Sequence, residues 1–135
     1  MPDKTSNMRD DAIKILKAAI AAVDPENAVK SFLSFSNNTL SAGDEKYNLN
    51  EYHRVVVVGA GKASAPMAKA VESILGDRIN KGTVVIKYGY GMLLDRIELI
   101  EAGHPVPDEN GLAGTQKIAD LLDACTENDL IISLI

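Results

Sequence analysis

The feature that most constrains this fold is a run of β-branched residues followed by two glycines. Residues 55–58 are four consecutive valines, and they lead directly into Gly59, Ala60 and Gly61. A strand that is apolar at every position is covered on both faces, as in a parallel sheet, whereas a strand with one wet face alternates apolar and polar residues. The run therefore predicts a buried strand in an α/β domain whose sheet is mainly parallel.

The residues that follow alternate between helical and extended patterns. In order, they predict a helix over 62–75, strands over 83–86 and 97–101, a helix over 108–123 and a strand over 130–135. Strands that alternate with helices in this way are typical of a Rossmann-like, mainly parallel sheet flanked by helices. We therefore assign residues 51–135 to an α/β portion.

A helical lead-in is predicted before the first strand. Residues 6–23 have apolar side chains at a period of 3.6, and Asp24 and Pro25 then end one helix and begin another. We expect the two helices to form a hairpin and the lead-in to cover residues 1–36. Residues 36–50 are rich in turn formers and predict a connector, in which a short edge strand at Leu40 or over 47–49 is the alternative.

Composition excludes several classes of protein. The chain has 135 residues, of which 46% are hydrophobic and 24% charged, and its net charge is -5, which indicates one globular domain and excludes disorder. The acidic excess is concentrated in residues 95–135, where 9 acidic residues stand against 2 basic ones. With 4 tyrosines, 2 phenylalanines, no tryptophan and no basic stripe, the chain lacks the features of nucleic-acid binding.

The expected compartment is the cytoplasm. The single cysteine, Cys125, cannot form an internal disulfide, and the first residues lack the apolar core of a secretory signal. The longest apolar run, 130–135, is far too short to cross a bilayer, so no membrane association is expected. His53 and His104 lie far apart in the sequence, and with one cysteine they predict no metal site.

The segment from Gly59 to Ser64 is a candidate anion site because it joins the buried strand to a helix. Glycines at 59 and 61 let the backbone approach a ligand, and the N–H groups of a helix start, including that of Ser64, attract an anion. Lys62 opposes the helix dipole, so we interpret it as an anion-holding residue; a lysine that extends its side chain into solvent at a helix start is the alternative.

Two familiar nucleotide motifs do not fit this segment. The dinucleotide fingerprint requires a third glycine where Ser64 stands, and an acidic residue where Lys87 and Tyr88 end the second strand. A Walker loop would require glycine at Val56 and a hydroxyl residue at Ala63. The sequence therefore disfavours both nicotinamide binding and a Walker-type site.

A second candidate segment follows the third strand. Pro105 restricts His104 to an extended conformation, and Asp108 has the position of a helix N-cap. If the strands are parallel, His104, Lys62 and Lys87 leave the same edge of the sheet, where α/β folds bind ligands. We consider His104, Asp108 and Lys87 candidate substrate-binding residues. The alternatives are a loop-fixing hydrogen bond for His104, capping alone for Asp108 and a solvated lysine at 87.

Three segments, 54–68, 82–89 and 101–110, resemble the amino-terminal region of the type II glycerate 2-kinases, some of which are named hydroxypyruvate reductases. The resemblance spans essentially the whole chain, so that residues 1–135 correspond to the first part of a glycerate kinase-like domain. It implies transfer of the γ-phosphoryl group of ATP to D-glycerate, giving 2-phosphoglycerate, with Mg²⁺ as cofactor and Lys62 as an active-site residue in a cleft between two domains.

The sequence also departs from that family. In the family, the strand matching 129–134 continues into a glycine-rich phosphate-binding segment and later into a catalytic arginine, whereas Ile135 is the last residue here; Tyr90 stands where histidine is frequent. We therefore expect a truncated, inactive chain that self-associates through the strand at 130–135. The alternatives are a non-catalytic α/β remnant with weak anion binding or partner association and, less favoured, a hydroxypyruvate reductase.

Overall fold

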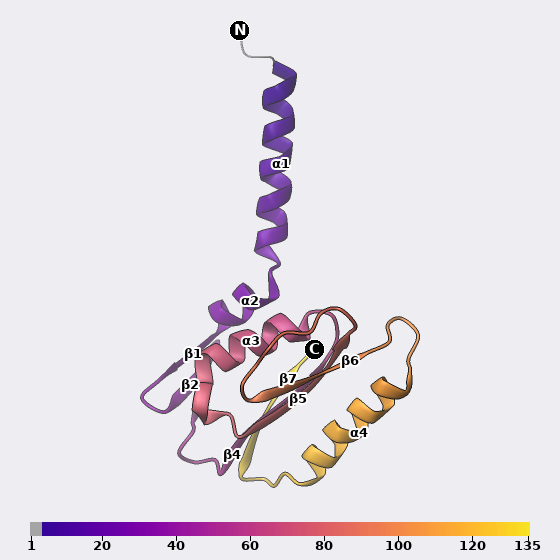
Figure 1. Cartoon of the computed structure of the whole chain (residues 1–135). Coiled ribbons are helices and arrows are strands. Elements are labelled where there is room, and N and C mark those ends of the chain that lie inside the picture. Colours follow the sequence, from indigo (N-terminus) through magenta and orange to yellow (C-terminus); the bar gives the residue numbers. More distant parts are fainter. Residues whose placement is uncertain (1–3) are drawn as a thin grey trace.

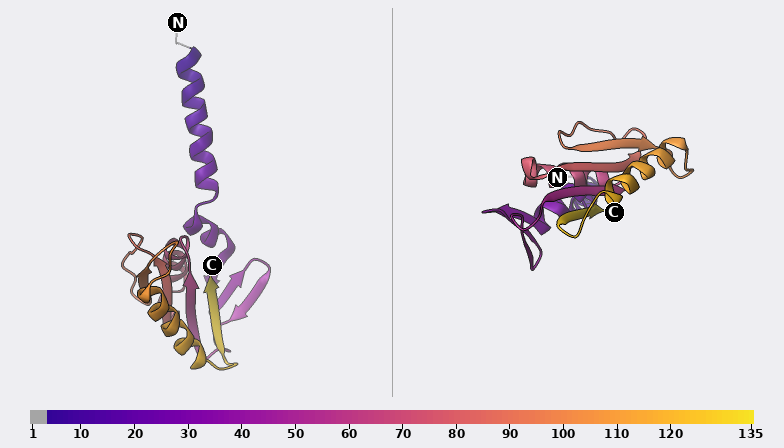
Figure 2. Two further views of the ribbon diagram at one scale, coloured as in Figure 1. Left: turned by 90° about the vertical axis from the view of Figure 1, so that its right-hand side faces the viewer. Right: turned by 90° about the horizontal axis from the view of Figure 1, so that it is seen from below.

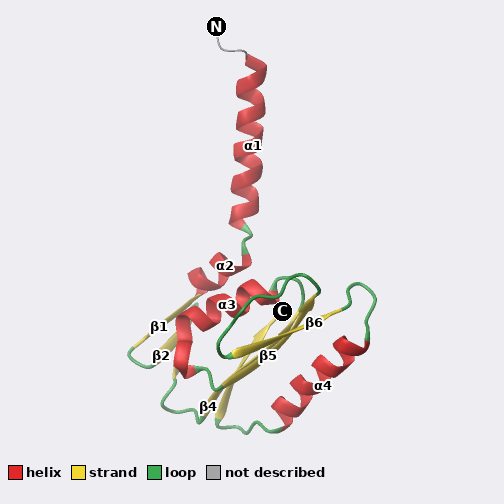
Figure 3. Ribbon diagram, in the orientation of Figure 1, coloured by secondary structure: helices red, strands yellow, loops and turns green. Residues whose placement is uncertain are grey.

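A computed structural model of the chain describes residues 4–135 (Figures 1 and 3). Two helices and three short strands precede a longer series of four strands and two helices, in which β5 is followed by β6 without a helix between them. In chain order the elements are α1 (Lys4–Ala22), α2 (Pro25–Phe32), β1 (Leu33–Ser36), β2 (Thr39–Ala42), β3 (Glu45–Asn48), β4 (Arg54–Ala60), α3 (Ser64–Leu75), a 3-10 turn (Gly76–Arg78), β5 (Lys81–Lys87), β6 (Ile97–Ala102), α4 (Glu109–Asp123) and β7 (Asp129–Leu134).

The predicted parallel sheet is confirmed. It has four strands in the order β6-β5-β4-β7, and every neighbouring pair is parallel. The valine run forms β4 at the interior of the sheet, where Val56 is 1% and Val57 0% exposed. The order matches a Rossmann-like arrangement, in which the chain leaves β4 on one side and returns to it on the other.

Helices cover both faces of the parallel sheet (Figure 2). Helix α4 packs on β5 and β6. Helix α3 packs on the opposite face, where its Val71 and Val84 of β5 belong to the main hydrophobic core. The close approach of α4 depends on Gly114, because a Cβ there would lie 2.7 Å from Val85 and 3.2 Å from Ile100. The central strand β4 is thus buried on both faces, as its continuous apolar run requires, whereas Ile131 of the edge strand β7 is 43% exposed.

The predicted connector at 36–50 is wrong, and its alternative of a short strand is closer, because Leu40 lies in β2 and residues 47–48 lie in β3. The end of the helical lead-in is also wrong. Strands β1, β2 and β3 form a separate antiparallel sheet that begins at Leu33, inside the lead-in expected over 1–36. The turn between β1 and β2 consists of Asn37 and Asn38, whose φ angles are 49° and 60°, as a two-residue hairpin requires. Strands of four residues are too short to show a period in the sequence.

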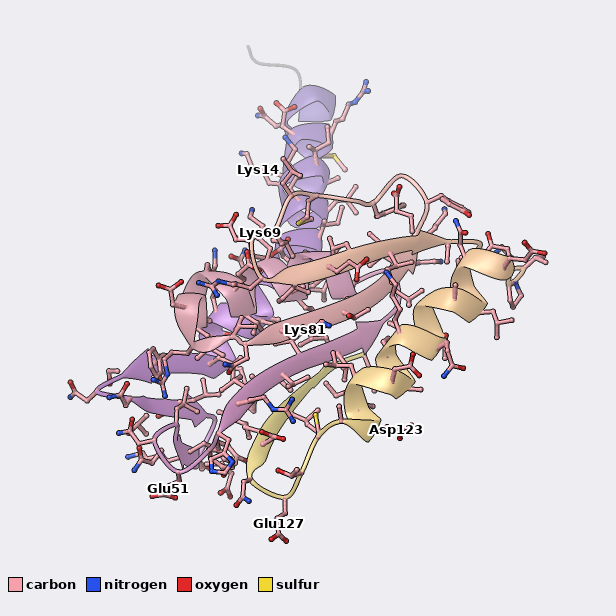
Figure 4. All side chains as sticks on the ribbon, turned by 60° about the horizontal axis from the view of Figure 1, so that its bottom comes forward. Lys14, Glu51, Lys69, Lys81, Asp123 and Glu127 are labelled. Atoms are coloured by element: carbon pink, nitrogen blue, oxygen red, sulfur yellow. The ribbon has the colours of Figure 1, made fainter. Side chains whose placement is uncertain are left out.

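Both predicted helices of the lead-in are present, and Asp24 caps the second through a 2.8 Å hydrogen bond from the Asn27 N–H. The predicted hairpin is wrong, because α1 projects away from the body while α2 packs on α3 (Figures 1 and 2). Every residue from 7 to 23 is exposed, and Figure 4 shows Lys14 on this projecting helix. No helix within residues 4–135 is both long and apolar enough to cross a membrane.

An ion pair joins the start of β4 to the start of β7. Arg54 donates from Nε to Oδ1 of Asp129 at 3.0 Å and from Nη2 to Oδ2 at 2.6 Å, and Nη2 also reaches the Ala124 carbonyl. The Asp129 carboxylate is 1% exposed and accepts a further hydrogen bond from the Thr126 N–H. These donors, Arg54 first, hold the pKa of Asp129 well below its usual range.

Candidate functional site

The carboxyl ends of β4, β5 and β6 meet at one edge of the parallel sheet and enclose a small cavity. Its volume is about 160 Å³, and three strand exits contribute to it. The lining residues are Ala60, Gly61, Lys62, Val85, Ile86, Lys87, Ala102, Gly103 and His104. Three of the candidates chosen from the sequence, Lys62, Lys87 and His104, therefore share one site, which we call the edge pocket.

Lys62 reaches the edge pocket from the loop between β4 and α3. Its side chain is exposed and has no ion pair with any carboxylate in residues 7–135. The first turn of α3 begins beside it without a side-chain cap, since the N-cap residue is Ala63. The exposed ammonium of Lys62 favours an anion at this edge of the sheet, and α3, a helix of 12 residues, begins two residues after it.

Lys87 and His104 enter the edge pocket from β5 and from the loop after β6. The Lys87 ammonium lies over the Tyr90 ring, 5.4 Å from its centroid, which is a cation–π distance. His104 is exposed and stands between Gly103 and Pro105. The three side chains offer two ammonium groups and one imidazole, and none of them is a carboxylate.

Gly59 and Ser64, predicted to bind a cofactor, are instead occupied in packing. The Ser64 hydroxyl is buried and donates to the Leu134 carbonyl at 3.3 Å. A Cβ at Gly59 would lie 2.5 Å from the same carbonyl oxygen, so glycine is needed for β7 to approach β4. Only Gly61 of the three backbone candidates lines the edge pocket.

Asp108 is not among the residues that line the edge pocket; it lies at the start of α4, at the end of the loop that carries His104. Its Oδ1 accepts from the Gly111 N–H at 2.9 Å, which confirms the predicted cap of α4, and its Oδ2 accepts from the Tyr88 hydroxyl at 2.8 Å. The N–H groups of Gly111 and Gly103, followed by the Tyr88 hydroxyl, lower the pKa of Asp108. The same carboxylate raises the pKa of Tyr88.

The sequence analysis missed Tyr88 and Glu101 as structural members of the site. Glu101 accepts hydrogen bonds through Oε1 from the N–H groups of Gly89, at 2.7 Å, and Gly91, at 3.1 Å, and so shapes the turn that carries Tyr90. The available signal was weak: two glycines flanking a tyrosine after one strand, and an acidic residue at the end of the next. Neither pattern indicates a hydrogen bond between Glu101 and the turn at 89–91 unless the pairing of β5 with β6 is known.

The edge pocket has the chemistry of a small anion site. Cavities that enclose drug-sized ligands measure roughly 300–1,000 Å³, so a cavity of about 160 Å³ fits one phosphoryl group or a small carboxylic acid better than a whole nucleotide. Residues 4–135 contain no group of three or more histidine, cysteine or acidic side chains arranged to hold a metal ion. The residues on this edge therefore match an anion, and we assign no metal ligand among them.

Residues 11–135 match the family described as "Domain of unknown function (DUF4147)". The match covers more than half of the chain. The chain belongs to the DUF4147 family. Among its relatives is the D-glycerate 2-kinase of Thermotoga maritima, which is 43% identical over 125 residues; the alignment covers 92% of this chain and 27% of that protein. The glycerate 2-kinase resemblance inferred from the motifs is thus confirmed.

Two crystal structures agree with the fold of this DUF4147 chain. One is of a protein from Pyrococcus horikoshii OT3, with a TM-score of 0.82, 36% identity and coverage of 95% of this chain and 28% of that one. The other is of the glycerate kinase from Thermotoga maritima, with a TM-score of 0.75, 38% identity and coverage of 96% and 28%. The chain therefore spans little more than a quarter of the length of these proteins, and the predicted α/β fold class is confirmed.

Replacement of Gly61 by alanine tests the backbone of the edge pocket. Gly61 has a φ of +128°, which L residues rarely adopt, although a Cβ would meet only the Ser64 Oγ at 3.5 Å. We expect strain of about 1–3 kcal/mol to lower the melting temperature by about 5 °C, measured by circular dichroism. The matched control is Gly111→Ala, in α4, which should leave the melting temperature unchanged or raise it. Equal melting of both variants would contradict the strain.

Proposed function

We propose that this chain carries one wall of the active site of a glycerate 2-kinase, which transfers the γ-phosphoryl group of ATP to the 2-hydroxyl of D-glycerate. The observation that carries the proposal is the convergence of Lys62, Lys87 and His104 on the edge pocket. The name and similarity of the Thermotoga maritima relative support the same activity. Cytoplasmic localisation remains part of this proposal.

The chemistry of phosphoryl transfer explains why such a wall is useful. The reaction depends mostly on positioning and on electrostatic stabilisation of the phosphoryl oxygens, so preplaced cations contribute directly to the rate. In this proposal Lys62, beside the uncapped start of α3, neutralises charge on the transferred group. Lys87 and His104, on the other two strand exits, bind the carboxylate and hydroxyl groups of glycerate.

The implied Mg²⁺ does not fit the edge pocket. Magnesium is held in proteins by carboxylate and carbonyl oxygens, together with substrate phosphates, whereas the side chains that converge here are Lys62, Lys87 and His104. We therefore derive no step through the metal from these residues. ATP and Mg²⁺ remain cofactors of the proposed enzyme, and the residues of this chain act on the anionic groups.

A direct assay tests the proposed activity. The complete gene product that contains these residues is incubated with D-glycerate and ATP, and the product is followed by ³¹P NMR, which separates 2-phosphoglycerate from 3-phosphoglycerate. We expect 2-phosphoglycerate, formed only in the presence of both substrates. The same preparation is offered hydroxypyruvate with NADH or NADPH, because the reductase alternative remains untested. Oxidation of the nicotinamide without phosphoryl transfer would overturn the proposal.

We also propose that the 135-residue chain self-associates through β7. This strand forms one edge of the parallel sheet, and an apolar groove of about 330 Å³ lies beside it, between α2 and the antiparallel sheet. Ile131 is 43% and Phe32 60% exposed there, and an exposed apolar edge favours pairing between chains. Sedimentation velocity at several concentrations should show association that Ile131→Lys abolishes. A monomer at every concentration would contradict it.

A further inference from the structure

The loops after β5 and β6 are joined by a hydrogen-bond chain that no part of the proposed chemistry requires. Tyr88, the first residue after β5, donates its hydroxyl proton to Oδ2 of Asp108 at 2.8 Å, and the Asn110 amide donates to the Tyr88 oxygen at 2.9 Å. Tyr88 is separated from Asp108 by 20 residues, so the bond closes a long segment. We call these three residues the loop latch.

Asp108 gathers donors from three elements at once. Its carboxylate accepts from the Tyr88 hydroxyl at the end of β5 and from the Gly111 N–H in the first turn of α4, and the Gly103 N–H at the exit of β6 also lowers its pKa. A Cβ on Gly103 would lie only 3.1 Å from Oδ2, so the two ends of the segment 103–108 are in contact. The segment is thus closed into a loop at its base.

The loop latch borders the edge pocket on two sides. Lys87 directly precedes Tyr88, whose N–H donates to the Ala102 carbonyl at 3.2 Å, and His104 directly follows Gly103. The residues from His104 to Pro107 are exposed, so contacts at the base of the loop are what determine where the imidazole stands. The latch thus lies next to Lys87 and at the base of the loop that carries His104, and it includes neither side chain.

We propose that Tyr88 and Asp108 are positioning residues that fix His104 relative to Lys87 across the edge pocket. Asp108, which the sequence suggested as a substrate ligand, acts in this view through the loop that it closes. Two experiments test this proposal. The kinetic experiment rests on the proposed kinase function. The binding experiment uses inorganic phosphate and the 135-residue chain, and it is independent of that function.

The binding test uses the two histidines of the chain, His53 and His104. Their imidazole Cε1–H signals are assigned by ¹H NMR with His53→Gln, and inorganic phosphate is titrated. We expect Tyr88→Phe to broaden the His104 signal and to weaken phosphate binding about tenfold, while the His53 signal, at the opposite end of β4, stays unchanged. Tyr47→Phe, which removes a hydroxyl from β3, is the matched control. Wild-type line width and phosphate affinity in Tyr88→Phe would overturn the proposal.

The kinetic test separates positioning from a merely structural role. In the complete gene product, Tyr88→Phe should raise KM for D-glycerate about tenfold and leave kcat within about twofold, because ground-state and transition-state binding weaken together. A structural role would instead reduce the active fraction, lowering kcat at constant KM, and would overturn the proposal. Asp108→Asn, which keeps Oδ1 for the cap, should match Tyr88→Phe, and the double variant should show no further loss.

The two proposals fail in different ways. A wild-type gene product that forms no 2-phosphoglycerate would remove the kinase function and leave the phosphate titration and the His104 line width as the test of the loop latch. An active wild-type enzyme with a Tyr88→Phe variant of unchanged KM would retain the kinase function and remove the latch.

Discussion

We expect Lys62→Ala to lower the turnover of the complete gene product about 10²–10³-fold, the usual loss when one preorganised charge contact to the transition state is removed. The effect on stability should be within about 2 °C, because the side chain is exposed and has no ion pair within residues 7–135. The helix start beside it has no side-chain cap that the lysine could disturb. Steady-state kinetics and a melting curve on the same preparation measure both quantities.

Lys81→Ala is the matched control for this variant. Lys81, labelled in Figure 4, is an exposed lysine of the same sheet. It is the first residue of β5, whereas Lys87 is the last, so the two lie at opposite ends of the strand. Removing its charge changes the net charge by the same amount, so any general electrostatic effect on ATP appears in both variants. Near wild-type turnover in Lys62→Ala, or an equal loss in Lys81→Ala, would contradict the role assigned to Lys62.

The largest expected effect on stability is that of Asp129→Asn. The substitution leaves the Arg54 guanidinium without its carboxylate at the junction of β4 and β7, where the Asp129 side chain is 1% exposed. Breaking a buried pair by removing one partner is strongly destabilising, and solvent around Arg54, whose side chain is 37% exposed, reduces the loss. We expect the melting temperature to fall by roughly 10 °C, measured by circular dichroism at neutral pH.

The Arg54–Asp129 pair makes the stability of the wild-type chain fall as the pH is lowered. Because the folded pKa of Asp129 lies below the ordinary value of 3.8, its contribution to stability is complete above that value and is lost as pH falls toward the folded pKa. The melting temperatures of wild type and Asp129→Asn should therefore converge below about pH 4. Asp123→Asn, an exposed carboxylate in the last turn of α4, should differ little from wild type throughout. A constant gap down to pH 2 would contradict this.

The parallel sheet was predictable from the sequence because burial on both faces leaves a local signature. The valines of β4 are apolar at every position, and the glycines after them mark the strand end within one residue of the observed Ala60. Of the antiparallel sheet, the sequence suggested only a short strand at Leu40 or over 47–49 as an alternative. The sheet as a whole was not predictable, since its four-residue strands alternate too briefly and its turn depends on the two positive φ angles of Asn37 and Asn38. The projecting position of α1 was also not predicted, because a period of apolar residues predicts a helix but does not show which element the helix packs on.

The edge pocket was partly predictable for a similar reason. Lys62, Lys87 and His104 each follow a strand, and parallel strands bring their carboxyl ends together, so topology alone placed them near one another. The packing role of Ser64 was not predictable, because its hydroxyl donates to the Leu134 carbonyl, 70 residues away, a contact that no local pattern encodes. The loop latch was not predicted for the same reason. Tyr88 and Asp108 come together only because β5 pairs with β6.

The strand order also affects how such a site can diversify. The three walls of the edge pocket come from β4, β5 and β6, which are consecutive in both sequence and space. The backbone distance between neighbouring walls is set by the spacing of hydrogen-bonded strands, about 4.8 Å, and the walls after β5 and β6 are also joined by the Tyr88–Asp108 hydrogen bond. A substitution in the loop after β4, which takes no part in that hydrogen bond, can therefore exchange a side chain while the other two walls keep their places. We expect proteins with this fold to diversify most easily at the loop after β4, whereas the loops after β5 and β6 change together.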